Sequence, residues 1–301
     1  MLKLKPVTVL PMLLAGMMSF APAVFADEPR NPVKSVRTFF FGNSTIFHGN
    51  NTPETVVPYW INEFAKAGGN RFAFDGQFGF MQHHAEQPTI AQWGVSGVKG
   101  AWNSDTHKFG GANFDSIVIT SANFIQSVSA TEAFYGAPAS VVEFTLKVID
   151  DKHAEEPGVE FFIYENWPEM APFIADQAFP ADAGEFAKFN DFTMGTFHDW
   201  WVEYTEALKD ERPDVTIRLV PVGSMLSRLF TETGLSALTV EDLYVDEAPH
   251  GTGTLYFLAG IVTYTALYGQ TPEAGYPVPD VVHPLVREQY PEILKFVAAN
   301  M

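Results

Sequence analysis

The chain has 301 residues, of which 47% are hydrophobic, and its 36 Asp and Glu residues outnumber 18 Lys and Arg, giving a formal net charge of −18 at pH 7. This acidity makes nucleic acid and anionic membrane surfaces poor partners, because both repel a negatively charged protein. The sequence contains no cysteine, which excludes disulfides, thiolate catalysis and cysteine-based zinc sites.

The start of the chain has the features of a secretory signal peptide. Two lysines give it a positive charge, residues 7–18 are mostly apolar, and residues 24–26, Val-Phe-Ala, offer small side chains at a cleavage site. The apolar run is too short for a good membrane span, and no later segment of the sequence is long enough to be one. We therefore expect a signal peptide at 1–26, a mature chain at 27–301 that forms a single domain, and a periplasmic or secreted location.

Apolar runs of strand length alternate with segments of helical spacing in the rest of the sequence. In chain order the predicted elements are a strand at 36–41, a helix at 54–67, strands at 70–74 and 115–120, a helix at 139–150, a strand at 159–164, a long helix at 183–210, a strand at 215–220, a short helix over 226–230, and helices at 253–268 and 286–299. This alternation is typical of a parallel sheet covered by helices on both faces. The sequence therefore predicts an α/β fold in three layers.

Polar residues follow three of the predicted strands. Ser44 comes after the run FFFGN, Asn123 comes shortly after DSIVIT, and Trp167 lies in YENWP at the end of VEFFIY. In a parallel sheet, ligands bind beyond the carboxyl ends of the strands, and these residues share that edge. The pattern predicts a functional site there, with Trp167 and the nearby His48 in contact with the substrate.

Ser44 and a late histidine are the candidate nucleophile and base. A serine needs a base to take its proton, and the base needs an acid to orient it. His250 stands in VDEAPHGTGTLYFLAG, after Asp246 and Glu247. An acid on the same loop can reach the far imidazole nitrogen and fix its tautomer. The sequence therefore predicts a Ser-His-acid triad in which either acid is the third member.

Four separated blocks resemble the motifs of the SGNH, or GDSL-like, hydrolases. FFFGNST is similar to the first block, with Ser44 as the nucleophile. VITSANF resembles the third, with Asn123 as the oxyanion-hole asparagine, and DEAPHGTG resembles the last, with His250 as the base. FDGQFGFMQHH stands where a glycine block is expected, and there Gly79 is the first and Gly76 the second candidate for an oxyanion-hole N–H.

The resemblance implies a flavodoxin-like three-layer fold and a serine hydrolase mechanism on esters, with no metal and no cofactor. It implies that the backbone N–H of Ser44 joins the glycine and Asn123 in the oxyanion hole. In the family the acid lies three residues before the histidine. That spacing favours Glu247, whereas Asp246 lies one residue further away; both stay open.

The leading prediction is an exported serine esterase that acts on acyl or acetyl esters of small molecules or carbohydrates. The alternatives are a catalytically silent polysaccharide-binding module and an acyltransferase on the same fold. The joint presence of Ser44, Asn123 and His250 favours an enzyme, since a silent relative has no need of all three. The pair His83-His84 lacks the HExxH spacing of a zinc site, and we expect ordinary polar contacts from it.

Overall fold

The computed structural model describes residues 29–49, 52–175 and 178–301, so the predicted signal peptide lies outside the described residues. At its centre is a five-stranded parallel sheet with strand order β2-β1-β3-β4-β5. The strands are β1 (Ser35–Gly42), β2 (Arg71–Phe78), β3 (Ser116–Ile119), β4 (Glu160–Tyr164) and β5 (Ile217–Val220). This is the flavodoxin-like order, and it confirms the predicted α/β fold.

Helices connect the strands and cover the sheet. They are α1 (Val57–Ala67), α2 (Met81–Glu86), α3 (Val141–Glu155), α4 (Ala183–Phe192), α5 (His198–Glu211), α6 (Val222–Glu232), α7 (Val240–Leu243), α8 (Gly253–Tyr268) and α9 (Pro284–Asn300). Shorter turns of helix are η1 (Pro53–Thr55), η2 (Phe109–Gly111), η3 (Ala171–Phe173), the π-type turn η5 (Thr193–Phe197) and η6 (Gly234–Ala237). Within the described residues, none of the helices has both the length and the apolar character that crossing a bilayer requires.

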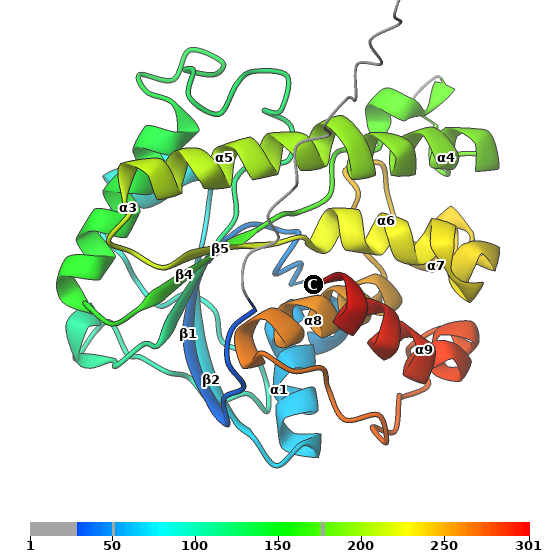
Figure 1. The fold of residues 1–301 in the computed structure, drawn as a ribbon, viewed down its shortest axis with the longest axis horizontal. Coiled ribbons are helices and arrows are strands. Elements are labelled where there is room, and N and C mark those ends of the chain that lie inside the picture. Colours follow the sequence, from blue (N-terminus) through cyan, green and yellow to red (C-terminus); the bar gives the residue numbers. More distant parts are fainter. Residues whose placement is uncertain (1–28, 50–51, 176–177) are drawn as a thin grey trace, which may run out of the picture.

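The sheet separates two layers of hydrophobic core. Along β1, Phe40 belongs to the layer formed with α1 and α8, whereas Phe39 and Phe41 belong to the layer formed with α3 and α5. Successive side chains of a strand point to opposite faces, so the unbroken apolar runs of the sequence serve both layers. Figure 1 shows α3 and α5 on one side of the sheet and α1 and α8 on the other.

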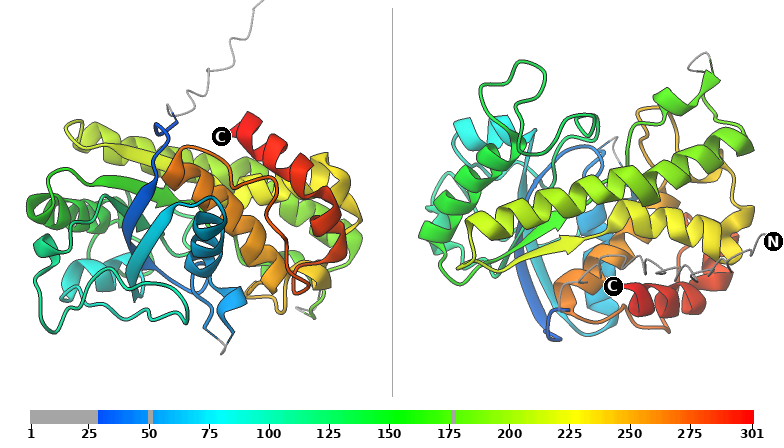
Figure 2. Two further views of the ribbon diagram at one scale, coloured as in Figure 1. Left: turned by 90° about the horizontal axis from the view of Figure 1, so that it is seen from below. Right: turned by 45° about the horizontal axis from the view of Figure 1, so that its top comes forward.

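Helix α8 is buried around nearly its whole circumference. It lies against α1, α6 and α9, as the views in Figure 2 also show. A helix that is apolar all round is expected at such a central place. Gly260 permits the close approach to α1, because a Cβ there would lie 2.6 Å from the Cβ of Trp60.

Strand β2 extends to Phe78, beyond the predicted end at residue 74. The sequence pattern did not predict this extension, because the additional part of the strand contains the buried polar residues Asp75 and Gln77. Asp75 accepts a hydrogen bond from the N–H of Trp102 at 2.5 Å, and Gln77 accepts one from the N–H of Ile90 at 3.1 Å. The irregular segment after α2 thus satisfies the polar groups of β2, which the strand pattern alone did not indicate.

The long helix predicted at 183–210 is divided into α4 and α5. Between them Gly195 has the non-helical angles φ −102° and ψ −112°. Glycine tolerates such angles because it lacks a Cβ. The break makes His198 the first residue of α5, close to the end of β4.

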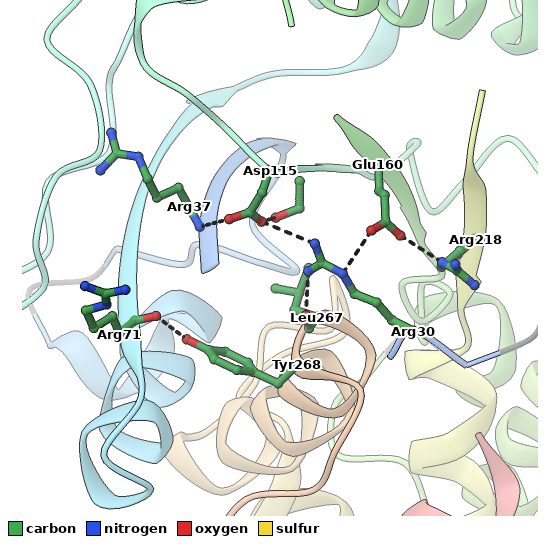
Figure 3. A network of polar contacts seen from close by, with 9 residues as sticks. Arg30, Arg37, Arg71, Asp115, Glu160, Arg218, Leu267 and Tyr268 are labelled. Carbon is green, nitrogen blue, oxygen red and sulfur yellow. Dashed lines mark hydrogen bonds and ion pairs between the residues drawn. The ribbon is translucent and has the colours of Figure 1, made fainter. Parts of the chain in front are cut away.

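Arg30 fastens the start of the described chain to the amino ends of the strands. Figure 3 shows its guanidinium between two carboxylates, at 3.0 Å from Glu160 and 3.6 Å from Asp115. It also donates to the carbonyl of Leu267 at 2.7 Å, and Arg218 binds the other oxygen of Glu160 at 3.0 Å. This ionic network lies at the edge of the sheet opposite to the predicted site, which leaves the carboxyl edge for function.

Candidate active site

Ser44 lies on a tight turn directly after β1. The buried side chain of Asn43 holds this turn, because its Oδ1 accepts hydrogen bonds from the N–H of Thr45 at 3.0 Å and from its hydroxyl at 2.7 Å. The N–H groups of Ile46 and Phe47 both donate to the carbonyl of Asn43, at 3.1 and 3.0 Å. The side-chain oxygen of an asparagine commonly accepts the backbone N–H two residues further on, as that of Asn43 does from Thr45. Ser44 is thereby held half-buried at the carboxyl edge of the sheet.

Side-chain amides join the ends of three neighbouring strands. The carbonyl of Ser121, after β3, accepts hydrogen bonds from Nδ2 of Asn43 at 3.1 Å and from Nδ2 of Asn166 at 2.8 Å. All three residues are almost completely buried. Because buried amides are costly unless bonded, this arrangement fixes the turn of Ser44 relative to the loop that carries Asn123. The sequence placed Asn166 at this edge without indicating its role.

Asn123 stands just beyond this amide arrangement. It is half-buried, and within the described residues its side chain has no hydrogen-bond partner. Its amide N–H₂ is therefore available as a donor at the edge where Ser44 lies. The role of Asn123 in an oxyanion hole stays a prediction.

His250 and Asp246 form a close pair in the loop between α7 and α8. The loop is closed by a hydrogen bond from the N–H of Val245 to the carbonyl of His250 at 2.8 Å. Oδ2 of Asp246 lies 2.7 Å from Nδ1 of His250, and Oδ1 accepts the backbone N–H of His250 at 2.9 Å. Partial burial by itself would raise the pKa of Asp246, but the hydrogen bonds from His250 outweigh it and lower that pKa below its usual value.

The preference for Glu247 as the acid that meets His250 is wrong. The carboxylate on the imidazole belongs to Asp246, and Glu247 is exposed, with no hydrogen bond or ion pair to His250 among the described residues. The carbonyl of Glu247 accepts hydrogen bonds from the N–H groups of Met170 and Ala171 at 3.0 and 3.2 Å. These bonds fix the backbone of Glu247 against the segment after β4, while the turn of the loop brings Asp246 to the ring.

Two further residues connect the turn of Ser44 with the loop of His250. The hydroxyl of Tyr256, on the first turn of α8, donates to the carbonyl of Ser44 at 2.6 Å. The ring of His48 lies against that of His250, with centroids 3.9 Å apart and planes inclined by 35°. Burial, and then the neighbouring His250, lower the pKa of His48, so its ring is held neutral. Tyr256 was missed by the sequence analysis, and its place soon after His250 was the available signal.

The hydroxyl of Ser44 makes no hydrogen bond to His250 or to any other residue in the part of the chain that the structure describes. Bonds between a nucleophile and its base are often long without substrate and shorten when substrate binds. The structure thus brings the two residues into one neighbourhood through Tyr256 and His48 rather than through a direct bond.

Neither glycine predicted for the oxyanion hole fits that role. The N–H of Gly79 donates to the carbonyl of Gly42 at 2.9 Å and so continues the pairing of β2 with β1. Gly76 lies inside β2, opposite Phe40, and a Cβ there would come within 2.3 Å of the ring of Trp93. Both predictions are corrected: Gly79 completes the ladder, and Gly76 makes room for a buried tryptophan.

Trp167 is also not placed to meet a substrate. It is 1% exposed, and its Nε1 donates to the carbonyl of Pro249 at 2.9 Å. The indole therefore supports the loop of His250 from beneath. The predicted substrate contact is corrected to a structural role, which the position of Trp167 after a strand could not reveal.

His84, of the pair His83-His84, is buried under Gly79, and neither of its ring nitrogens has a hydrogen-bond partner. The ordinary polar contacts expected of it are absent from the described residues. Across residues 29–49, 52–175 and 178–301, no three His, Asp or Glu side chains are grouped so as to hold a metal ion.

No family model and no curated protein sequence matches the chain. Among solved structures it is similar to a DUF4886 family protein from Bacteroides uniformis, with a TM-score of 0.55 and 12% identity over 88% of this chain and 94% of that protein. A protein described as a GDSL-like lipase from Parabacteroides merdae gives a TM-score of 0.44 at 12% identity, over 79% of this chain and 98% of the other. A mutant acetyl-xylooligosaccharide esterase from Geobacillus gives 0.43 at 10% identity, over 84% and 99%. Likeness at such identities concerns the fold, so a function has to be argued from the site.

Proposed function

We propose that the protein is an exported serine esterase that hydrolyses acyl or acetyl esters, with carbohydrate esters among its substrates. The observation that carries the proposal is the Asp246–His250 pair, which lies beside the turn of Ser44 at the carboxyl edge of the sheet. The loops after β1 and β3 flank the point where the strand order reverses, the usual ligand site of such sheets. The signal-like start of the sequence supports export, and the resemblance of the Ser44, Asn123 and His250 blocks to SGNH motifs supports ester chemistry.

In the first half of the reaction, Nε2 of His250 takes the proton of the Ser44 hydroxyl while the serine oxygen bonds to the ester carbonyl carbon. Asp246 holds the proton on Nδ1, which leaves Nε2 free to accept, and it stabilises the imidazolium that forms. The imidazolium then gives its proton to the departing alcohol, and the acyl group stays on Ser44. Water repeats the sequence, yielding the carboxylic acid and the free serine.

The negative charge of the tetrahedral intermediate needs hydrogen-bond donors. We assign this role to the side-chain amide of Asn123 and to the backbone N–H of Ser44, since Gly79 and Gly76 have other duties. Loss of one such donor typically lowers kcat by about 10²–10³-fold. His48, whose ring lies against that of His250 at an inclination of 35°, covers one side of the base and lines the approach to it.

Hydrolysis of a panel of p-nitrophenyl esters and acetylated sugars tests the proposal, using wild type, Ser44→Ala and the control Ser236→Ala, an exposed serine elsewhere. We expect Ser44→Ala to abolish hydrolysis and Ser236→Ala to retain it. An organophosphonate should label Ser44 in the wild type. A label on another serine, or equal activity in Ser44→Ala, would overturn the assignment. Binding of polysaccharide without any turnover would favour the silent module, and acyl transfer to an added alcohol in preference to water would favour the transferase.

A further inference from the structure

A cavity of about 620 Å³ lies away from the proposed catalytic residues, none of which lines it. It is bounded by residues of α5, α6, the end of α8 and the end of α9, beside β4 and β5. Figure 1 shows how these helices are arranged around the sheet. Much of its wall is apolar, with contributions from Phe162, Met194, Val202, Met225, Ala266 and Met301. Ligand pockets of this size are usually apolar with a few placed polar groups.

His198 supplies such a polar group. Its Nδ1 lies 2.7 Å from Oε2 of Glu165, a carboxylate that is 0% exposed. The other oxygen of Glu165 accepts the N–H of Ser224 at 2.6 Å. The carboxylate is thus bonded at both oxygens, and it fixes the imidazole by Nδ1. Nε2 of His198 has no hydrogen-bond partner within the described residues, and His198 is one of the residues that line the cavity.

The pair favours a charged imidazole. Burial alone would lower the pKa of His198, but the hydrogen bond and the charge of Glu165, with a smaller contribution from Asp199, raise it above its usual value, while the nearby Arg228 opposes this. In that state Nε2 is an N–H donor bordering an apolar space. A charged donor in such surroundings is stabilised by a negatively charged acceptor.

The other basic residues of the lining differ from His198, because they are paired with more exposed acids. Arg30 and Arg218 bind Glu160, Arg228 binds Glu232, and Lys209 binds Glu206. Figure 3 shows the contacts of Arg30 and of Arg218 with Glu160. These ion pairs form a polar boundary to the cavity. His198 differs from them because its partner Glu165 is completely buried and its Nε2 has no hydrogen-bond partner among the described residues, so His198 is the group that would recognise a ligand.

We propose that this cavity binds an aliphatic carboxylate, with the carboxylate on Nε2 of His198 and the alkyl chain along the apolar wall. The volume is within the range of small-molecule pockets and leaves room for an alkyl chain of medium length. The imidazolium discriminates in favour of a carboxylate over an alcohol and against an amine of equal length. The proposal is independent of the esterase function, because it uses none of the residues of that site.

Isothermal titration of the full chain with decanoate, decanol and decylamine tests the proposal. We expect decanoate to bind at least about tenfold more tightly than decanol, and affinity to rise about fourfold with each CH₂ from hexanoate to decanoate. Equal binding of decanoate and decanol would overturn the role of His198. Tighter binding of decylamine, or no binding of any of the three, would overturn the ligand class.

Two variants locate the binding. His198→Gln should bring decanoate and decanol close to parity, and Ala266→Trp, which fills the cavity from α8, should abolish binding of both. His107→Gln, an exposed histidine elsewhere, is the control. Unchanged decanoate binding in Ala266→Trp would show that it binds at another place. If His198→Gln does not fold, the wild-type preference for decanoate over decanol still tests the ligand class, and the loss of binding in Ala266→Trp still tests the location. Activity at Ser44 should be the same in wild type and Ala266→Trp, so the two proposals fail separately.

Discussion

Asp246 binds His250 twice, with one carboxylate oxygen 2.7 Å from Nδ1 of the ring and the other 2.9 Å from the backbone N–H. The same side chain therefore sets both the direction of the imidazole and the path of the loop that carries it. A proton held on Nδ1 leaves Nε2 as the basic nitrogen. This relationship decides between the two acids that the sequence left open, and it makes the first prediction.

Asp246→Asn should lower kcat for ester hydrolysis by about 10⁴-fold, because loss of the orienting acid leaves the imidazole in the wrong tautomer. Glu247→Gln should leave kcat essentially unchanged, since Glu247 is exposed and forms no hydrogen bond or ion pair with His250 among the described residues. Steady-state kinetics of both variants on p-nitrophenyl acetate provide the measurement. The reverse order of effects would return the role to Glu247.

Trp167→Phe should destabilise the loop of His250 without changing substrate recognition. The change leaves the buried carbonyl of Pro249 without its donor, which costs about 1–3 kcal/mol. We expect a lower free energy of unfolding and a lower kcat, with KM unchanged for simple and for carbohydrate esters. The control is Trp102→Phe, whose indole donates to His107 away from the site. A KM that rises for carbohydrate esters alone would restore Trp167 to the substrate-binding role.

His84 should make the protein sensitive to acid. Burial lowers its pKa from 6.5 to about 4. The unfolded chain takes up this proton at a higher pH than the folded chain does. The contribution of neutral His84 to the free energy of unfolding is therefore fully present above pH 6.5 and is lost as the pH falls toward 4, by about 3 kcal/mol in total.

His84→Leu should remove this part of the pH dependence and should not destabilise the protein at neutral pH, since neither ring nitrogen is bonded. Urea unfolding of wild type, His84→Leu and the control His107→Gln, at neutral pH and near pH 4, provides the comparison. An equal loss of stability in wild type and His84→Leu would assign the acid sensitivity to other groups.

Export should remove the start of the chain. We expect the mature protein to begin at Asp27, since the small residues before it suit a signal peptidase. Intact mass spectrometry of the secreted or periplasmic fraction measures this directly. A chain that keeps Met1 and stays with the membrane fraction would show a retained anchor instead.

The sequence by itself determined the fold class and placed the candidate site residues at the carboxyl edge of the sheet. Apolar strands such as VEFFIY, alternating with helical segments, required a sheet buried on both faces, and that requirement made the sheet parallel. Because parallel strands end at the same edge, Ser44 and Asn123 had to lie near each other. No local pattern, however, could show that Asp75 and Gln77 belong to a strand, since their partners lie in a distant loop.

The tertiary structure decided which groups meet at the site. Asp246 and Glu247 are equally acidic neighbours, and only the path of the loop turns one toward His250 and fixes the backbone of the other against Met170. Gly79 and Trp167 suited functional roles by position, yet the N–H of one and the indole of the other are taken up by hydrogen bonds to distant carbonyls. Hydrogen bonds between residues far apart in the chain depend on how its segments pack, and a single sequence carries no local signal of them.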